Sequence, residues 1–108
     1  MVSTPFLQNQ GPNFWNLNGL YPNPFSDALT VAFTLGKPAE LRFRAYNVAG
    51  EPVWEESLRF LPGQNFYRWK GVNSQLAVAA SGVYLVFLRF QAEDGDFGED
   101  KALAVIAR

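Results

Sequence analysis

The sequence contains neither histidine nor cysteine. Without histidine, the chain lacks the side chain whose ordinary pKa suits proton transfer near neutral pH. Without cysteine, it has no thiolate nucleophile, no thiolate metal site and no disulfide. Its serines therefore have no histidine to activate them, and most hydrolase mechanisms are excluded. The absence of cysteine leaves the redox compartment open, because a domain with a sufficient core folds without disulfides.

An excess of charge and a long apolar run are also missing. Nine basic and ten acidic residues give a net charge of −1, so the attraction that drives nucleic-acid binding is absent. The longest apolar stretch, residues 83–88, is far shorter than the roughly 20 residues that span a bilayer. Residues 1–10 lack the basic cluster and apolar core of a signal peptide. We predict no nucleic-acid partner and no membrane span, and we expect Met1 to begin an excised fragment.

The sequence does have enough apolar content for one core. Its 108 residues are 48% hydrophobic and 16% aromatic, which indicates a single domain, since domains cluster at roughly 100 to 150 residues. Residues 1–19 are rich in Asn, Gln, Gly and Pro without a sustained period, so we predict a linker or leading segment there and a domain over residues 20–108. Phe6, Phe14 and Trp15 remain candidates for packing on that domain, because linkers carry few aromatic residues.

Alternation of apolar and polar residues predicts short strands throughout residues 20–108. The predicted strands cover residues 29–35, 41–46, 53–60, 66–69, 83–90 and 101–107, and the connection over residues 70–80 has room for a short strand or a helical turn. Glu56 weakens the pattern of the third strand. No segment has a sustained helical period. The expected fold is all-β: an Ig-like antiparallel β-sandwich of about seven short strands.

The parity of the strands also predicts which side chains form the core. The predicted core residues are Leu29, Val31, Phe33, Leu41, Phe43, Trp69, Tyr84, Val86 and Leu88, and we expect the Tyr84 hydroxyl to be hydrogen-bonded at the rim. Leu85 and Phe87 have the opposite parity on the most apolar strand. Something must cover them, and a neighbouring strand, a preceding domain and a partner protein all remain open.

We find no residue pattern that predicts catalysis, a cofactor or a metal. Glu55 and Glu56 are neighbours on a strand and point to opposite faces, which is the wrong geometry for paired acid and base catalysis. The acidic turn from Glu93 to Asp100 has oxygen ligands for calcium but does not match an EF-hand loop, so a solvated hairpin tip is favoured. We therefore predict that the domain is not an enzyme and needs no cofactor.

Several short motifs follow one another in the chain. Tyr21-Pro22-Asn23-Pro24-Phe25 precedes the first predicted strand, where the prolines restrict the backbone and favour an extended segment. We expect Gly50 and Gly82 to lie in turns that need a positive φ or a close backbone approach. The later segments are Leu41–Gly50, Trp69-Lys70-Gly71, Ser81-Gly82-Val83-Tyr84 and the apolar segment Lys101–Arg108 with basic residues at both ends.

In this order, the motifs resemble those of the C-terminal sorting domains of the type IX secretion system and of the related Ig-like domain of flagellar hook-capping proteins. The residues that carry the resemblance are Tyr21, Pro22, Asn23, Pro24, Phe25, Gly50, Trp69, Gly71, Ser81, Gly82, Val83, Tyr84, Lys101, Leu103, Val105 and Arg108. The sequence departs from the family pattern at Lys70, where an acidic residue is common, and at Gln75 and Leu76, where a glycine is common.

The resemblance implies a non-catalytic module that directs a larger secreted protein through the periplasm and the outer membrane to the cell surface. Its implied partners are the outer-membrane secretion machinery, the upstream cargo domain of the same chain and a sortase, with removal of the domain within residues 1–19. We expect a monomer. We also expect Leu103 and Val105 to dock the last strand on the sheet, while its backbone stays free for pairing with a receptor.

The alternative is a structural or carbohydrate-binding accessory module of a secreted polysaccharide-degrading enzyme. Three Trp, four Tyr and ten Phe invite the idea of stacking on sugar rings. However, phenylalanine outnumbers the other aromatic residues, which is more typical of core filling than of an exposed platform.

Overall fold

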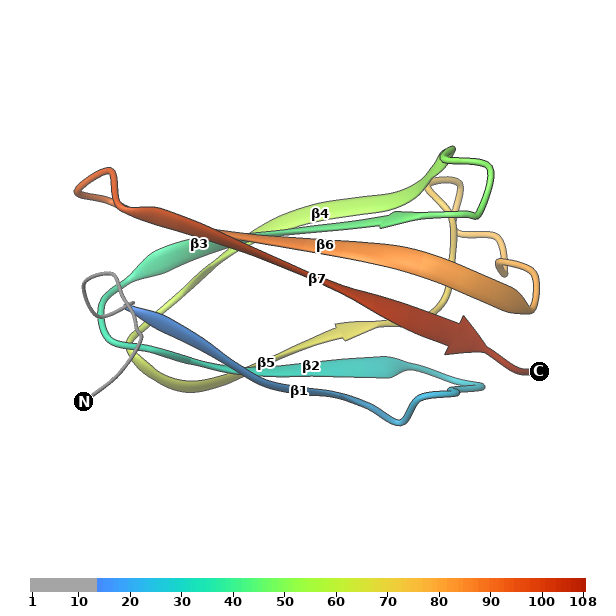
Figure 1. Cartoon of the computed structure of the whole chain (residues 1–108), viewed down its shortest axis with the longest axis horizontal. Coiled ribbons are helices and arrows are strands. Elements are labelled where there is room, and N and C mark those ends of the chain that lie inside the picture. Colours follow the sequence, from blue (N-terminus) through green and yellow to red (C-terminus); the bar gives the residue numbers. More distant parts are fainter. Residues whose placement is uncertain (1–13) are drawn as a thin grey trace, which may run out of the picture.

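The computed structural model describes residues 14–108, which form seven β-strands and, within that range, no helix that could cross a membrane. The strands are β1 (Trp15–Tyr21), β2 (Leu29–Leu35), β3 (Ala39–Tyr46), β4 (Pro52–Phe60), β5 (Gly63–Trp69), β6 (Gly82–Ala92) and β7 (Phe97–Ile106). They pair antiparallel in two sheets, ordered β1-β2-β5 and β4-β3-β6-β7 (Figure 1). The predicted all-β sandwich is confirmed.

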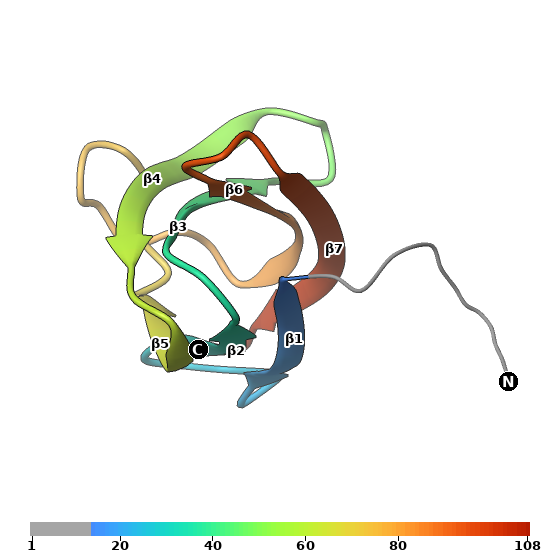
Figure 2. The ribbon, with the colours of Figure 1, turned by 90° about the vertical axis from the view of Figure 1, so that its left-hand side faces the viewer.

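The two sheets face each other, with the chain crossing between them (Figure 2). Because Gly36, Lys37 and Pro38 interrupt the alternation after β2, the chain leaves the first sheet there and enters β3 in the second. The chain returns to the first sheet between β4 and β5, and residues 70–81 then carry it from β5 to β6 in the second sheet. As a result β2 pairs with β5 and β3 pairs with β6, so that each sheet joins strands that are distant in sequence, as in Ig-like sandwiches.

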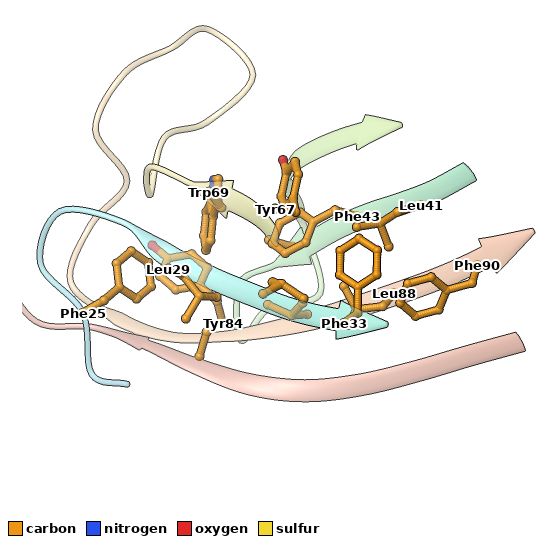
Figure 3. Packing of buried hydrophobic residues seen from close by; sticks show 14 of the residues in the cluster. Phe25, Leu29, Phe33, Leu41, Phe43, Tyr67, Trp69, Tyr84, Leu88 and Phe90 are labelled. Atoms are coloured by element: carbon orange, nitrogen blue, oxygen red, sulfur yellow. The ribbon is translucent and has the colours of Figure 1, made fainter. Parts of the chain in front are cut away.

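The core lies between the sheets and contains the residues that parity predicts. Each of the nine predicted core residues is at most 6% exposed. Aromatic rings span the layer: the centroids of Phe33 and Phe90 are 5.3 Å apart, and those of Phe43 and Trp69 are 5.7 Å apart (Figure 3). Such contacts stabilise the sandwich beyond the burial of area alone.

Strand β1 lies in a region where we expected no strand. Trp15 and Leu17 point inward while Asn16 and Asn18 are exposed, and the register then shifts between Leu17 and Gly19. Because this bulge moves the next inward side chain out of phase, the alternation is too short to recognise in the sequence. The Trp15 ring stacks on Phe90 with a centroid distance of 5.0 Å, so Trp15 does pack on the domain.

Phe14 also packs against the core, as the sequence left open, whereas Phe6 lies outside the described residues. An added Cβ at Gly98 would collide with the indole of Trp15. The first residue of β1 is therefore seated directly on the backbone of β7.

A partly buried chain of hydrogen bonds joins the two sheets at the β4 and β5 edges, and it explains why Glu56 has the inward parity. Trp54 Nε1 donates to the Tyr67 hydroxyl at 2.9 Å, and that hydroxyl donates to Glu56 Oε1 at 2.7 Å. Burial, followed by the bond to Glu56, raises the pKa of Tyr67 above its ordinary value. Glu56 thus occupies the inward parity because it has a buried hydroxyl partner. Glu55 points the other way, to Arg42, which confirms that the two glutamates do not face each other.

The acidic turn is shorter than predicted, because β7 begins at Phe97 and takes Glu99 and Asp100 into the strand. Cross-strand pairing of Glu99 with Arg89 at 3.0 Å favours this extension. At the tip, Lys37 Nζ contacts Asp94 at 2.5 Å and Asp96 at 2.7 Å. These bonds raise the pKa of Lys37 and lower that of Asp94. Among residues 14–108, no cluster of acidic side chains has the arrangement of a metal site.

Candidate functional site

Most of the predicted motif residues meet at the end of the sandwich where β7 ends (Figure 1). Segments 21–25, 69–71, 81–84 and 103–108 converge there although they are far apart in sequence. Gly50 lies in the β3–β4 turn, where it lines a surface hollow together with Val83 and Leu103. Lys101 lies earlier on β7 with an exposed side chain. We call the group formed by Asn23, Phe25, Gly71, Ile106 and Arg108 the terminal clamp.

Segment 22–25 covers the outer edge of β7. The Asn23 amide donates from Nδ2 to the Leu103 carbonyl and accepts from the Val105 N–H through Oδ1, both at 2.9 Å. The Phe25 N–H donates to the Val105 carbonyl at 2.8 Å, and the Ala107 N–H donates to the Phe25 carbonyl at 2.9 Å. The side chain of Asn23 and the backbone of Phe25 therefore act as a short extra strand beside β7.

The expectation of an extended segment between the prolines is wrong. Residues 22–24 form bends, and the peptide bonds before Pro22 and Pro24 are both cis. In this bent conformation the Asn23 side chain is directed at β7, and Phe25 is 1% exposed.

Two expectations for β7 are wrong as well. Leu103 is 58% exposed, whereas Ala104 and Ile106 are at most 1% exposed and face the core. Because apolar residues occupy both parities in this segment, periodicity had no means of choosing the buried face. The backbone over residues 103–107 is also not free, since Asn23 and Phe25 already occupy its hydrogen-bonding groups.

Three aromatic rings from different segments support the clamp from inside. Trp69 is 1% exposed, and its ring centroid lies 5.7 Å from those of Phe25 and Tyr84, edge to face in both cases (Figure 3). The Trp69 Nε1 donates to the Val72 carbonyl at 3.0 Å. The Tyr84 hydroxyl donates to the Ala80 carbonyl at 2.6 Å, which confirms the expected rim bond. Both polar bonds hold the loop between β5 and β6.

Arg108 fastens the end of the chain to that loop. Its guanidinium donates to the carbonyls of Ser26 at 2.6 Å, Gly71 at 2.7 Å and Ala79 at 3.3 Å. Its backbone N–H donates to the Ser81 hydroxyl at 3.0 Å. Several donors in a fixed fork allow one arginine to satisfy carbonyls from several segments. The sequence marked Arg108 as a motif residue but contained no signal for these partners, because backbone carbonyls carry no residue identity.

Gly71 is required where it stands. Its φ is +68°, and an added Cβ would lie 2.5 Å from Arg108 Nη2 and 3.1 Å from Phe25 Cε2. A side chain here would push the guanidinium off its carbonyls. The predicted positive φ is also present at Gly50 and Gly82. In the loop that follows Gly71, Leu76 takes a φ of 64°, at the place where the sequence departs from the family's glycine.

We expect Gly71→Ala and Arg108→Ala each to lower the free energy of unfolding by about 1 to 3 kcal/mol, through backbone strain and lost carbonyl bonds respectively. The double variant should lose less than the sum, because without the guanidinium the new methyl group has one fewer clash. Urea unfolding of the four proteins measures this coupling. Additive losses would show that Gly71 and Arg108 do not depend on each other.

The site holds segments together, and its described residues offer no proton-transfer pair. All three tryptophans serve the interior: Trp69 is buried, and Trp15 and Trp54 are partly buried against the core. No described tryptophan is therefore available as an open platform for a sugar ring.

Comparison with solved structures supports the fold. The chain is similar to part of latent, dimeric PorU from Porphyromonas gingivalis, with a TM-score of 0.75 and 13% identity, over 98% of this chain and 10% of that chain. It is also similar to FlgD from Xanthomonas campestris, whose structure bears on the hook capping that is essential for flagellar assembly, with a TM-score of 0.63 and 14% identity, over 85% of this chain and 67% of that chain. At these identities the likeness shows a shared fold, and this chain spans a tenth of PorU.

Comparison with curated proteins gives no match. The family model of the secretion system C-terminal sorting domain matches residues 19–95. This range contains the predicted motifs from Tyr21 to Tyr84. Because the match covers more than half of the sequence, the chain belongs to the family of secretion system C-terminal sorting domains, which direct the proteins that carry them through the type IX secretion system to the cell surface or the extracellular space.

Proposed function

We propose that the terminal clamp is the part of this domain on which sorting depends. The observation that carries the proposal is the convergence of the motif segments 21–25, 69–71, 81–84 and 103–108 at one end of the sandwich. The clamp presents the end of β7 in a single conformation, and a pre-organised surface binds a receptor at a lower entropic cost.

The proposed partners are the outer-membrane secretion machinery and the cargo domain that precedes the module in the same chain. The module itself is proposed to be a non-catalytic monomer, preceded by a linker within which a sortase acts. Its predicted start at residue 20 moves back to residue 14, because β1 lies partly within the predicted linker of residues 1–19. Because β1 begins at Trp15 and pairs with β2, cleavage before Phe14 would leave every strand of the sandwich intact. We therefore place the cut within residues 1–13.

Export of a reporter tests this proposal. A periplasmic reporter fused before residues 1–108, in a host with the type IX machinery, should reach the outside of the cell. Asn23→Ala should reduce export, because it removes both side-chain bonds to β7. The control is Asn65→Ala, which removes an exposed amide that bonds two carbonyls at the β4–β5 turn. Retention of the unaltered fusion in the periplasm would contradict the sorting function, whereas equal export of the two variants would contradict the role of the clamp.

A further inference from the structure

The outer face of the β4-β3-β6-β7 sheet is divided into two unlike halves. Toward the β6–β7 turn, three arginines form ion pairs with glutamates. The pairs are Arg42 with Glu55, Arg59 with Glu93, and Arg89 with Glu99. Such paired, exposed charges are typical of a sheet face that lies in water.

The half nearer to the terminal clamp is apolar and hollowed. We call this hollow, which has a volume of about 580 Å³, the outer groove. Its apolar lining comes from Tyr46, Val48, Val83, Leu85, Phe87 and Leu103. Val48 is 86% exposed and Leu103 is 58% exposed. The sequence predicted that Leu85 and Phe87 must be covered, yet Leu85 remains 37% exposed in the described chain.

Two cations flank the apolar floor of the groove at Phe87. Arg44 on β3 and Lys101 on β7 are the cross-strand neighbours of Phe87, and the Arg44 guanidinium lies 5.9 Å from its ring centroid. Neither cation lies within ion-pairing distance of a carboxylate in residues 14–108. The Arg44 Nε is buried without a hydrogen-bond partner in the described structure.

We propose that the outer groove docks a segment of a partner protein in which apolar side chains stand next to a carboxylate. The apolar side chains lie over Leu85 and Leu103, and the carboxylate lies between Arg44 and Lys101, where it accepts from the guanidinium. This rests on the proposed function, because the partner is a component of the export machinery. The groove shares Val83 and Leu103 with the segments that meet at the terminal clamp, but Leu85, Phe87 and the two cations lie outside those segments, so the groove is a second surface beside the clamp.

The geometry and charge of the groove argue against a sugar and against a membrane surface as its ligand. The rings of Tyr46 and Phe87 are inclined at 86°, so they cannot both stack on one sugar face. Attraction to an anionic membrane surface rests on clusters of about 4 to 8 basic residues, whereas this groove has two flanking cations in a chain of net charge −1. A carboxylate on an apolar protein segment fits both the charge and the shape.

The export assay also tests this proposal when the substitutions lie away from the clamp. Leu85→Glu and Arg44→Glu should each reduce export of the fusion to residues 1–108 by at least about tenfold, as expected for the centre of an interface. Arg44→Lys should retain part of the export, because it keeps the positive charge. The matched controls, Phe66→Glu and Arg68→Glu on the exposed side of β5, should leave export within about twofold of the unaltered fusion.

Urea unfolding of each purified 1–108 variant separates docking from stability, and Leu85→Ser replaces Leu85→Glu if the latter unfolds. Normal export of the folded groove variants, with the unaltered fusion exported, would overturn the docking proposal alone. Failure of the unaltered fusion would instead overturn the proposed function. Flotation with vesicles of phosphatidylethanolamine and phosphatidylglycerol at about 3:1, abolished by Arg44→Glu, would assign the groove to a membrane and overturn a protein partner.

Discussion

Removal of residues 104–108 is expected to unfold the domain. Ile106 is 1% exposed, and burial of such a side chain contributes about 1.5 to 3 kcal/mol. The deletion also removes the strand partner of Phe25 and the guanidinium that binds three carbonyls. Together these losses amount to several kcal/mol, against a total stability of roughly 5 to 15 kcal/mol for a domain. Tryptophan fluorescence and a urea titration should show loss of the cooperative transition.

Single substitutions in β7 provide a sharper version of this test. Ile106→Ala should cost about 2 to 5 kcal/mol, because it leaves a cavity between the sheets. Leu103→Ala, three residues earlier and 58% exposed, should change the stability by at most about 0.5 kcal/mol. Equal losses in the two variants would mean that the buried face of β7 is assigned wrongly. A defect in export after trimming of the chain end is therefore not evidence of an address unless folding is measured in the same variant.

Val86→Asp is expected to prevent folding altogether. Val86 is fully buried on β6, in the middle of the larger sheet. A carboxylate placed there has no cation or hydrogen-bond donor within the apolar core, and its burial costs several kcal/mol. This penalty approaches the whole stability of a small domain. Circular dichroism at neutral pH should show a chain without the cooperative β-sheet transition.

The matched control is Leu85→Asp, one residue earlier on the same strand and on the opposite face. Leu85 is 37% exposed, so a carboxylate there can remain hydrated, and the domain should still fold with a reduced melting temperature. Equal melting of Val86→Asp and the unaltered domain would contradict the placement of β6 at the centre of the fold.

Local periodicity was sufficient for the core strands because their two faces differ. Phe43 lies between Arg42 and Arg44, and a strand whose apolar and polar residues alternate in this way has one stable orientation. The same rule failed at β1, where a bulge after Leu17 breaks the period. It also failed at β7, where Leu103 and Ile106 are apolar on opposite faces, so that the sheet and not the pattern selects the buried one.

The sequence by itself determined which classes of function the composition excludes, the all-β class of the fold, and the motifs that place the chain in its family. Only the tertiary structure decided that Asn23 pairs with β7 and that Arg108 binds the carbonyls of Ser26, Gly71 and Ala79. These contacts join positions up to 82 residues apart, and most of them end on backbone atoms that every residue possesses. Because side-chain patterns record which residues are buried but not which carbonyl a distant side chain will meet, such a clamp becomes visible only when the two sheets are packed.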